Sequence, residues 1–233
     1  MSGSPAFEMT KGKPYAETFR CPGGDVCLDF CNSGQGLRGS HRTEWITGYE
    51  DLIDWLVAAG SMPEEQGLRL RKLASDTPEL AASVWIRAMR LREALFRVIH
   101  AVAQDIGTGA PEDLRLLESE HAATLSLACL SRIGERYAWS LDPSSTSLHA
   151  ALQPVVQAGL RLLTSESLIR VRRCGSPTCF WLFVDETKNR SRRWCEMASC
   201  GNLAKVRRHR EKARKQAGHL CHAVPEGDPQ TRQ

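Results

Sequence analysis

Apolar residues at helical spacing dominate the middle of the chain. From residue 78 to about residue 106 they recur every three or four positions, at Val84, Ala88, Leu91, Leu95, Val98 and Val102. This period places them on one side of a long helix. The same spacing predicts further helices over 49–59, from Pro63 onward, over 111–125 and over 148–164. The positions predicted to face inward include Leu68, Leu114 and Ala122.

Shorter segments have the composition of strands. Residues 125–139 alternate apolar and small polar residues around Gly134, which predicts a β-hairpin turning near 132–135. An aromatic and β-branched run at 180–184 precedes a polar stretch and predicts a second small hairpin. Residues 26–31 follow two glycines and are interpreted as a short strand or a buried segment. The predicted fold class is therefore mainly α, of the α+β type.

Four cysteines in the last third of the chain form two pairs with equal spacing. Four residues separate Cys174 from Cys179 and Cys195 from Cys200, and fifteen separate the two pairs. Structural zinc sites are closed by four protein ligands, and a segment too small for its own core gains stability from such a crosslink. We therefore predict one structural Zn²⁺ on these residues. Two disulfides or four unlinked thiols are the alternatives, but disulfides need an oxidising compartment, and no export signal is apparent.

Positive charge is concentrated beside these cysteines. Between residues 170 and 215, fourteen Lys or Arg stand against four Asp or Glu, a net charge of +10, whereas the whole chain carries +4. The remainder of the chain therefore carries −6. Such asymmetry is typical of a protein that binds phosphate groups.

A predicted helix over 202–216 carries much of this charge in two stripes. The alternative is a solvated tail helix whose charge serves solubility. The candidate nucleic-acid contacts lie on this helix and on the polar turn of the hairpin before it: Lys188, Arg190, Arg192, Arg193, Asn202, Lys205, Arg207, Arg208, Arg210, Lys212 and Arg214.

The run from Cys174 to Arg210 resembles the CGNR zinc-finger family. The motif that names the family reads Cys200-Gly201-Asn202 here, with Leu203 in place of the family's arginine. The resemblance continues through Asn189, Arg192, Arg193, Trp194, Cys195 and Met197. It implies that Cys174, Cys179, Cys195 and Cys200 bind the zinc. It also implies a bacterial, stress-related transcription regulator, whose finger follows an N-terminal ABATE domain regarded as a ligand sensor.

The resemblance extends over about residues 22–215 and sets the expected domain limits. We expect a disordered N-terminus over 1–20, an ABATE-like helical domain over 21–169, the zinc finger with its basic helix over 170–216 (the finger), and a disordered tail over 217–233. No Gly/Pro linker separates the two domains, so we expect the finger to dock against the helical domain.

A ligand cavity in the helical domain is suggested only by the family's sensor role. Its candidate residues are Asp29, Asn32 and Arg92. The alternative for Arg92 is a local ion pair with Glu93.

The favoured function is a DNA-binding transcription regulator of the cytoplasm and nucleoid, with a small-molecule effector. RNA binding by the same surface is an alternative, in which Trp181, Phe183 and Trp194 would stack on bases instead of forming the hairpin core. A protein-interaction module is a third reading. An enzyme is the least favoured, because four thiolates leave zinc no open position. A homodimer stays open, although no apolar heptad supports it, and no apolar run is long enough to span a membrane.

Overall fold

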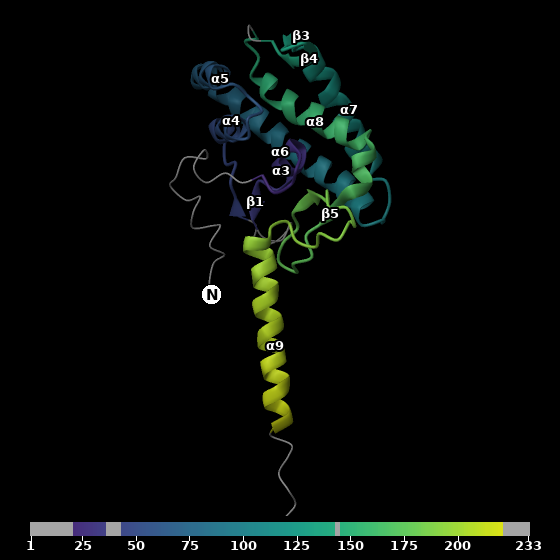
Figure 1. The fold of residues 1–233 in the computed structure, drawn as a ribbon. Helices are drawn as coiled ribbons and strands as arrows, with labels where there is room; N and C mark the ends of the chain where they lie inside the picture. The colour runs from purple at the N-terminus through teal and green to yellow at the C-terminus, as the bar shows by residue number, and fades with distance from the viewer. Residues whose placement is uncertain (1–20, 36–42, 143–144, 221–233) are drawn as a thin grey trace, which may run out of the picture.

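The computed structural model describes residues 21–35, 43–142 and 145–220 (Figure 1). Its elements are mostly helices, as predicted. The helices and helical turns are α3 (Val26–Cys31), α4 (Tyr49–Ala58), α5 (Glu64–Asp76), α6 (Pro78–Ala103), α7 (Pro111–Leu125), the 3₁₀ turn η1 (Leu148–Leu152), α8 (Gln153–Leu163), the 3₁₀ turn η2 (Glu166–Arg170), the π-turn η3 (Met197–Gly201) and α9 (Asn202–Leu220). Among the described residues, no helix is long and apolar enough to cross a membrane.

The long helix α6 forms the centre of the helical body, and α3, α4, α7 and η1 pack around it (Figure 1). It begins at Pro78, where a missing backbone N–H costs nothing. Its apolar stripe is buried as the spacing predicted, with Leu91 and Leu95 almost fully inaccessible. The side chain of Leu95 on α6 packs against the backbone of α8 at Gly159, where a Cβ would lie 2.6 Å from Leu95 Cδ2.

The structure corrects several local predictions. Residues 26–31 are helical, and all but Val26 are buried; the Asp25 side chain accepts a hydrogen bond from Cys27 N and caps α3. The predicted helix over 148–164 is divided into η1 and α8, since Pro154 has no N–H to continue a helix from the preceding turn. Leu68, Leu114 and Ala122 are exposed, because α5 and α7 each bury only one narrow face.

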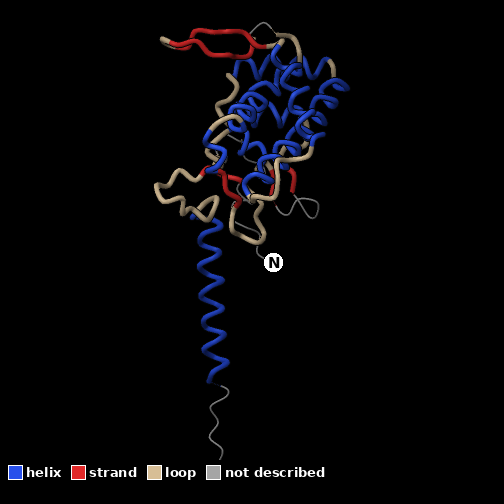
Figure 2. The backbone as a smooth tube through the Cα atoms, turned by 90° about the vertical axis from the view of Figure 1, so that its right-hand side faces the viewer, coloured by secondary structure: helices blue, strands red, loops and turns tan. Residues whose placement is uncertain are grey.

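The described strands form three antiparallel pairs: β1 (Gly34–Gln35) with β2 (Thr43–Glu44), β3 (Ala128–Ile133) with β4 (Arg136–Leu141), and β5 (Val171–Arg173) with β6 (Leu182–Val184). The hairpin β3–β4 turns at Gly134, within the predicted range. Figure 2 shows it at the opposite end of the molecule from α9.

The finger packs against the helical domain, as the missing linker predicted. Three side chains of β5 and β6, Val171, Leu182 and Val184, belong to the same buried cluster as the helices. Helix α9 then projects away from the body (Figure 1) and continues to Leu220, four residues beyond its predicted end at 216. The predicted disordered N-terminus, 1–20, and the rest of the predicted tail, 221–233, lie outside the described residues.

Candidate metal centre and nucleic-acid interface

The four paired cysteines meet at one point. The sulfurs of Cys174, Cys179, Cys195 and Cys200 all lie within 4.8 Å of one another. The Sγ atom of Cys195 lies 3.8 Å from that of Cys179 and 3.7 Å from that of Cys200. These distances exclude disulfides between those sulfurs, because S–S bonds are about 2.05 Å long. Zinc with Zn–S bonds of about 2.3 Å in a tetrahedron separates its sulfurs by about 3.8 Å, so the donor set fits zinc.

Backbone geometry brings the two pairs together. Cys174 follows β5, and its N–H donates to Trp181 O at 2.8 Å. The next residue, Gly175, donates to Arg193 O at 2.8 Å and so joins the first turn to the segment that carries Cys195. Cys200 lies in η3, directly before α9.

The glycine after Cys200 has a packing reason. A Cβ at Gly201 would meet the Met197 sulfur at 2.8 Å and Trp194 Cδ1 at 3.3 Å. Glycine therefore lets η3 fold over these side chains without displacing Met197, and this turn connects the metal site to the first residue of α9.

Four clustered thiols cannot all ionise without a cation. Hydrogen bonds from the neighbouring thiols, above all from that of Cys179, lower the pKa of Cys174. The hydrogen bond between Cys174 and Cys195 raises the pKa of Cys195. A bound zinc would favour the thiolate at every position. With all four ligands supplied by the chain, the centre is structural, and the finger would carry about +8, since four thiolates and one Zn²⁺ together contribute −2 to its +10.

Most predicted nucleic-acid contacts are exposed side chains. On α9, the six cations from Lys205 to Arg214 are all exposed, and none forms an ion pair within the described part of the chain. Asn202 begins the helix, is exposed, and donates to Ala198 O at 3.1 Å. On the hairpin turn, Lys188, Arg190 and Arg193 are also exposed.

Arg192, the remaining predicted contact, is half-buried and makes its contacts within the chain. Its guanidinium donates to four backbone carbonyls, those of Pro22, Val184, Trp194 and Cys195, at 2.5–3.2 Å. It also lies 4.3 Å from the centre of the Phe183 ring. These contacts hold the segment that carries Cys195 against β6 and the start of the helical domain, so Arg192 has a structural role.

The hairpin turn itself is organised by Asp185, which is fully buried. Its carboxylate accepts from Thr187 N, Thr187 Oγ1 and Arg192 N at 2.5–3.0 Å. Burial alone would raise the pKa of Asp185, but these hydrogen bonds outweigh it and hold the pKa below its ordinary value. The turn that presents Lys188 and Arg190 is therefore fixed from inside.

The aromatic residues of the finger pack inside it. Phe183 is fully buried. Trp181 donates to Gly34 O at 3.0 Å and meets Trp45 edge to face. Trp194 is half-buried, and the Arg193 guanidinium lies 5.4 Å from its ring centre. These placements favour a role in the hairpin core over base stacking for Trp181 and Phe183.

The three residues predicted to line a ligand cavity are used within the chain. Asn32 exchanges two hydrogen bonds with the backbone of Leu182 in β6, at 2.8 and 2.9 Å, and so attaches the finger to α3. Asp29 accepts from Gly23 N at 2.8 Å, and burial raises its pKa to about 7. Both side chains are therefore engaged by contacts within the chain.

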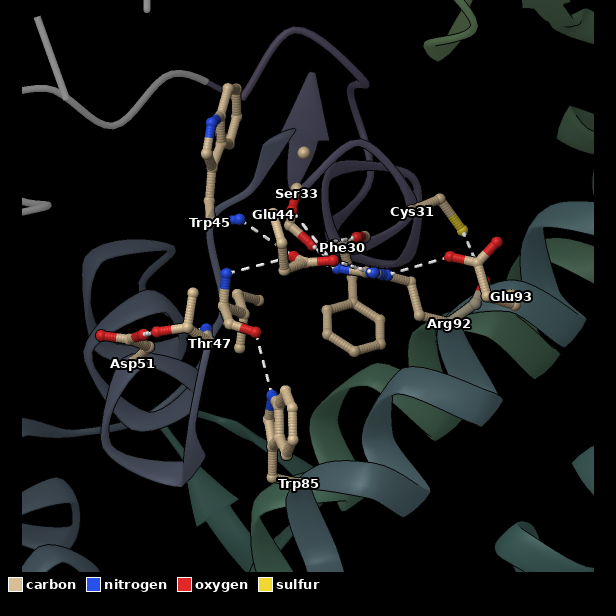
Figure 3. A network of polar contacts seen from close by, with 12 residues as sticks. Phe30, Cys31, Ser33, Glu44, Trp45, Thr47, Asp51, Trp85, Arg92 and Glu93 are labelled. Atoms are coloured by element: carbon tan, nitrogen blue, oxygen red, sulfur yellow. Dashed lines mark hydrogen bonds and ion pairs between the residues drawn. The ribbon is translucent and has the colours of Figure 1, made fainter. Parts of the chain in front are cut away.

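Figure 3 shows that Arg92 faces Glu44, on β2. The two form a bidentate ion pair at 2.5 and 2.7 Å, and Arg92 also donates to the hydroxyl of Ser33. Burial lowers the pKa of Arg92, but Glu44 outweighs this and raises it above its ordinary value. The local pair with Glu93 also forms, at 3.3 Å. Sequence spacing could indicate Glu93 but not Glu44, which is 48 residues away.

The structure thus defines a protein in which a helical domain carries a four-cysteine zinc finger and a projecting basic helix. The sequence model of the ABATE family, described as "Putative stress-induced transcription regulator", matches residues 24–166. That match spans more than half of the chain, and the chain belongs to the ABATE family. The CGNR zinc-finger model matches residues 170–213 and contains all four cysteines. Among curated proteins no match is found.

Proposed function

We propose that this protein is a bacterial DNA-binding transcription regulator. The observation that carries the proposal is the exposed, unpaired row of cations on α9, anchored at its first turn by the four-cysteine centre. The helix carries cations around most of its circumference and projects from the body, so it has little core of its own to pack against. A duplex phosphate backbone is the partner whose charge matches it.

The dimensions of α9 suit the major groove. Its 19 residues make a helix about 28 Å long, and B-DNA's major groove admits a helix. The exposed hairpin-turn cations Lys188 and Arg190 extend the same charged region. Asn202, at the start of the helix, could hydrogen-bond an adenine edge. The zinc supports this surface without taking part in chemistry, so we propose no enzymatic activity.

The charge does not by itself separate DNA from RNA. Sequence-specific RNA recognition uses exposed aromatic platforms, but Phe183 is fully buried and Trp181 is half-buried with its indole N–H bonded to the chain. This favours DNA. A protein-interaction module would need an acidic partner for the same helix, and co-purification with protein but not with nucleic acid would indicate it.

Regulation requires that the helical domain influence the finger. We propose that this domain binds a small effector and that its contacts with β6, through Asn32, transmit the bound state. On this view the protein acts in the cytoplasm, at the nucleoid. Paired half-sites in the selected DNA would indicate a homodimer.

The test is selection of bound sequences from random duplex DNA, followed by affinity measurements. A triple variant, Lys205→Ala with Arg208→Ala and Lys212→Ala, should lose most affinity. The matched control, Lys72→Ala with Arg90→Ala and Arg115→Ala, removes the same charge from exposed positions on the helical body and should keep it. Equal losses in both variants, or tighter binding to single-stranded RNA, would contradict the proposal.

A further inference from the structure

A pocket in the helical domain has the features of a ligand site. It has a volume of about 530 Å³, within the range of small-molecule sites. It lies where the start of α3, the start of α5, the start of α8 and strand β4 meet. None of the residues proposed from the sequence for a ligand cavity lines it.

The strongest observation is an unsatisfied amide. Gln153, the first residue of α8, lines this pocket with 2 % of its surface exposed, and its side-chain nitrogen has no hydrogen-bond partner among the described residues. A second amide, that of Gln66 on α5, is also buried and lines the same pocket. Buried amides in native proteins are nearly always hydrogen-bonded, so the unpaired donor points to an acceptor that comes from outside the chain.

The other lining groups define what that ligand would be. Trp139 of β4 is 55 % exposed and offers an aromatic face. The charged residues of the lining are Arg69, Arg161 and Glu65, which favours an anion. Each arginine has one ion-pair partner, Glu65 for Arg69 and Asp25 for Arg161. Because a guanidinium has five N–H donors, each can still bind an anionic group.

We infer that this pocket binds a small planar aromatic carboxylate, with its ring against Trp139, an oxygen accepting from Gln153 and its charge met by Arg161 and Arg69. The assignment deepens the effector-sensing part of the proposed function and rests on it.

Helix α3 joins the pocket to the finger. Its N-cap, Asp25, pairs with Arg161 at the pocket, with Nη2 and Oδ2 3.2 Å apart. At its other end Asn32 holds the backbone of β6. A carboxylate that draws Arg161 away from Asp25 therefore acts on the element that attaches the finger.

The test uses the full, zinc-loaded chain, with benzoate, salicylate and indole-3-carboxylate as probes. NMR titration should show saturable binding with dissociation constants on the order of 1 mM, as fits ligands of this size, and the Trp139 indole signal, assigned with Trp139→Phe, should move. Benzamide, which has the ring without the charge, should bind at least about tenfold more weakly.

Gln153→Leu should weaken probe binding at least about tenfold, whereas Gln104→Leu, an exposed glutamine at the end of α6, should not. Gln153→Leu removes an unpaired donor, so it should keep the wild-type melting temperature and remain testable. Gln153→Glu, which places a carboxylate toward the probe, should also abolish binding.

Absence of saturation up to about 10 mM, or binding unaffected by Gln153→Leu, would overturn the pocket assignment. Benzamide binding as tightly as benzoate would overturn its anionic part. These results are separable from the function proposed for the finger: DNA affinity in the absence of probe does not depend on the pocket. Probes that bind at Gln153 without changing DNA affinity would uphold the site and refute effector sensing.

Discussion

The contact between Asn32 and Leu182 tests how the finger is held. Asn32 is 3 % exposed, and its amide satisfies both the N–H and the C=O of Leu182, 150 residues away. Asn32→Ala leaves both backbone groups buried without a partner. Each such group costs about 1–3 kcal/mol, so we expect the two together to lower the free energy of unfolding by about 2–6 kcal/mol. That is a large part of the stability of an ordinary domain.

Urea unfolding of the zinc-loaded protein measures the loss. Hydrogen exchange locates the loss. The Leu182 amide should exchange much faster in Asn32→Ala, whereas the exchange rates of amides in the middle of α6 should change only as far as the global free energy of unfolding changes. Asn32→Asp should be at least as damaging, because it places a carboxylate oxygen against the Leu182 carbonyl. The matched control is Asn189→Ala, an exposed asparagine of the hairpin turn, which should change stability by less than about 0.5 kcal/mol.

A loss below about 0.5 kcal/mol in Asn32→Ala, with unchanged exchange at Leu182, would refute the docking described here. Asn32 would then be available as a ligand contact, the role that the family resemblance suggests.

Three further predictions concern the metal, the structural arginine and pH. Cys195→Ser should lose the single zinc, measured by metal analysis, and the amide signals of the finger should lose their dispersion while the helical domain stays folded. Arg192→Ala should cost about 2–4 kcal/mol in urea unfolding through its lost carbonyl contacts, whereas the exposed Lys188→Ala should leave stability unchanged and weaken only DNA binding. Burial raises the pKa of Asp29 from 3.8 to about 7, so the folded protein retains a proton that the unfolded chain has released, and stability should fall as pH rises from about 4 to 7. Asp29→Asn should remove this dependence and gain stability at pH 8, up to on the order of 4 kcal/mol; a melting temperature with the same pH profile as the wild type would contradict the assignment.

Sequence reasoning succeeded where the signal was local. The spacing of Leu91 and Leu95 predicted the buried face of α6, and the repeated gap between cysteines predicted that four sulfurs would meet. The first prediction follows from periodicity and the second from the ligand chemistry of zinc, and neither requires knowing which residues far apart in the sequence come into contact.

It failed where tertiary contacts decide. Charge alone placed Arg192 with the surface cations, but the nearby carbonyls and Phe183 draw it inward. Apolar composition left 26–31 as either a strand or a buried segment, because composition does not show that the Asp25 side chain caps a helix there. The pocket at Gln153 joins residues from four elements, and no spacing in the sequence brings these together.

The salt dependence of DNA binding tests the central claim most directly. The claim is that the zinc-anchored basic helix grips the phosphate backbone. Engagement of about five phosphates predicts a slope near −4.5 when the logarithm of the association constant is plotted against the logarithm of salt concentration. The triple variant on α9 should reduce the magnitude of this slope by about one for each phosphate contact removed, and the control triple on the helical body should not. A slope near zero for the wild-type protein, or the same slope in both variants, would contradict the account.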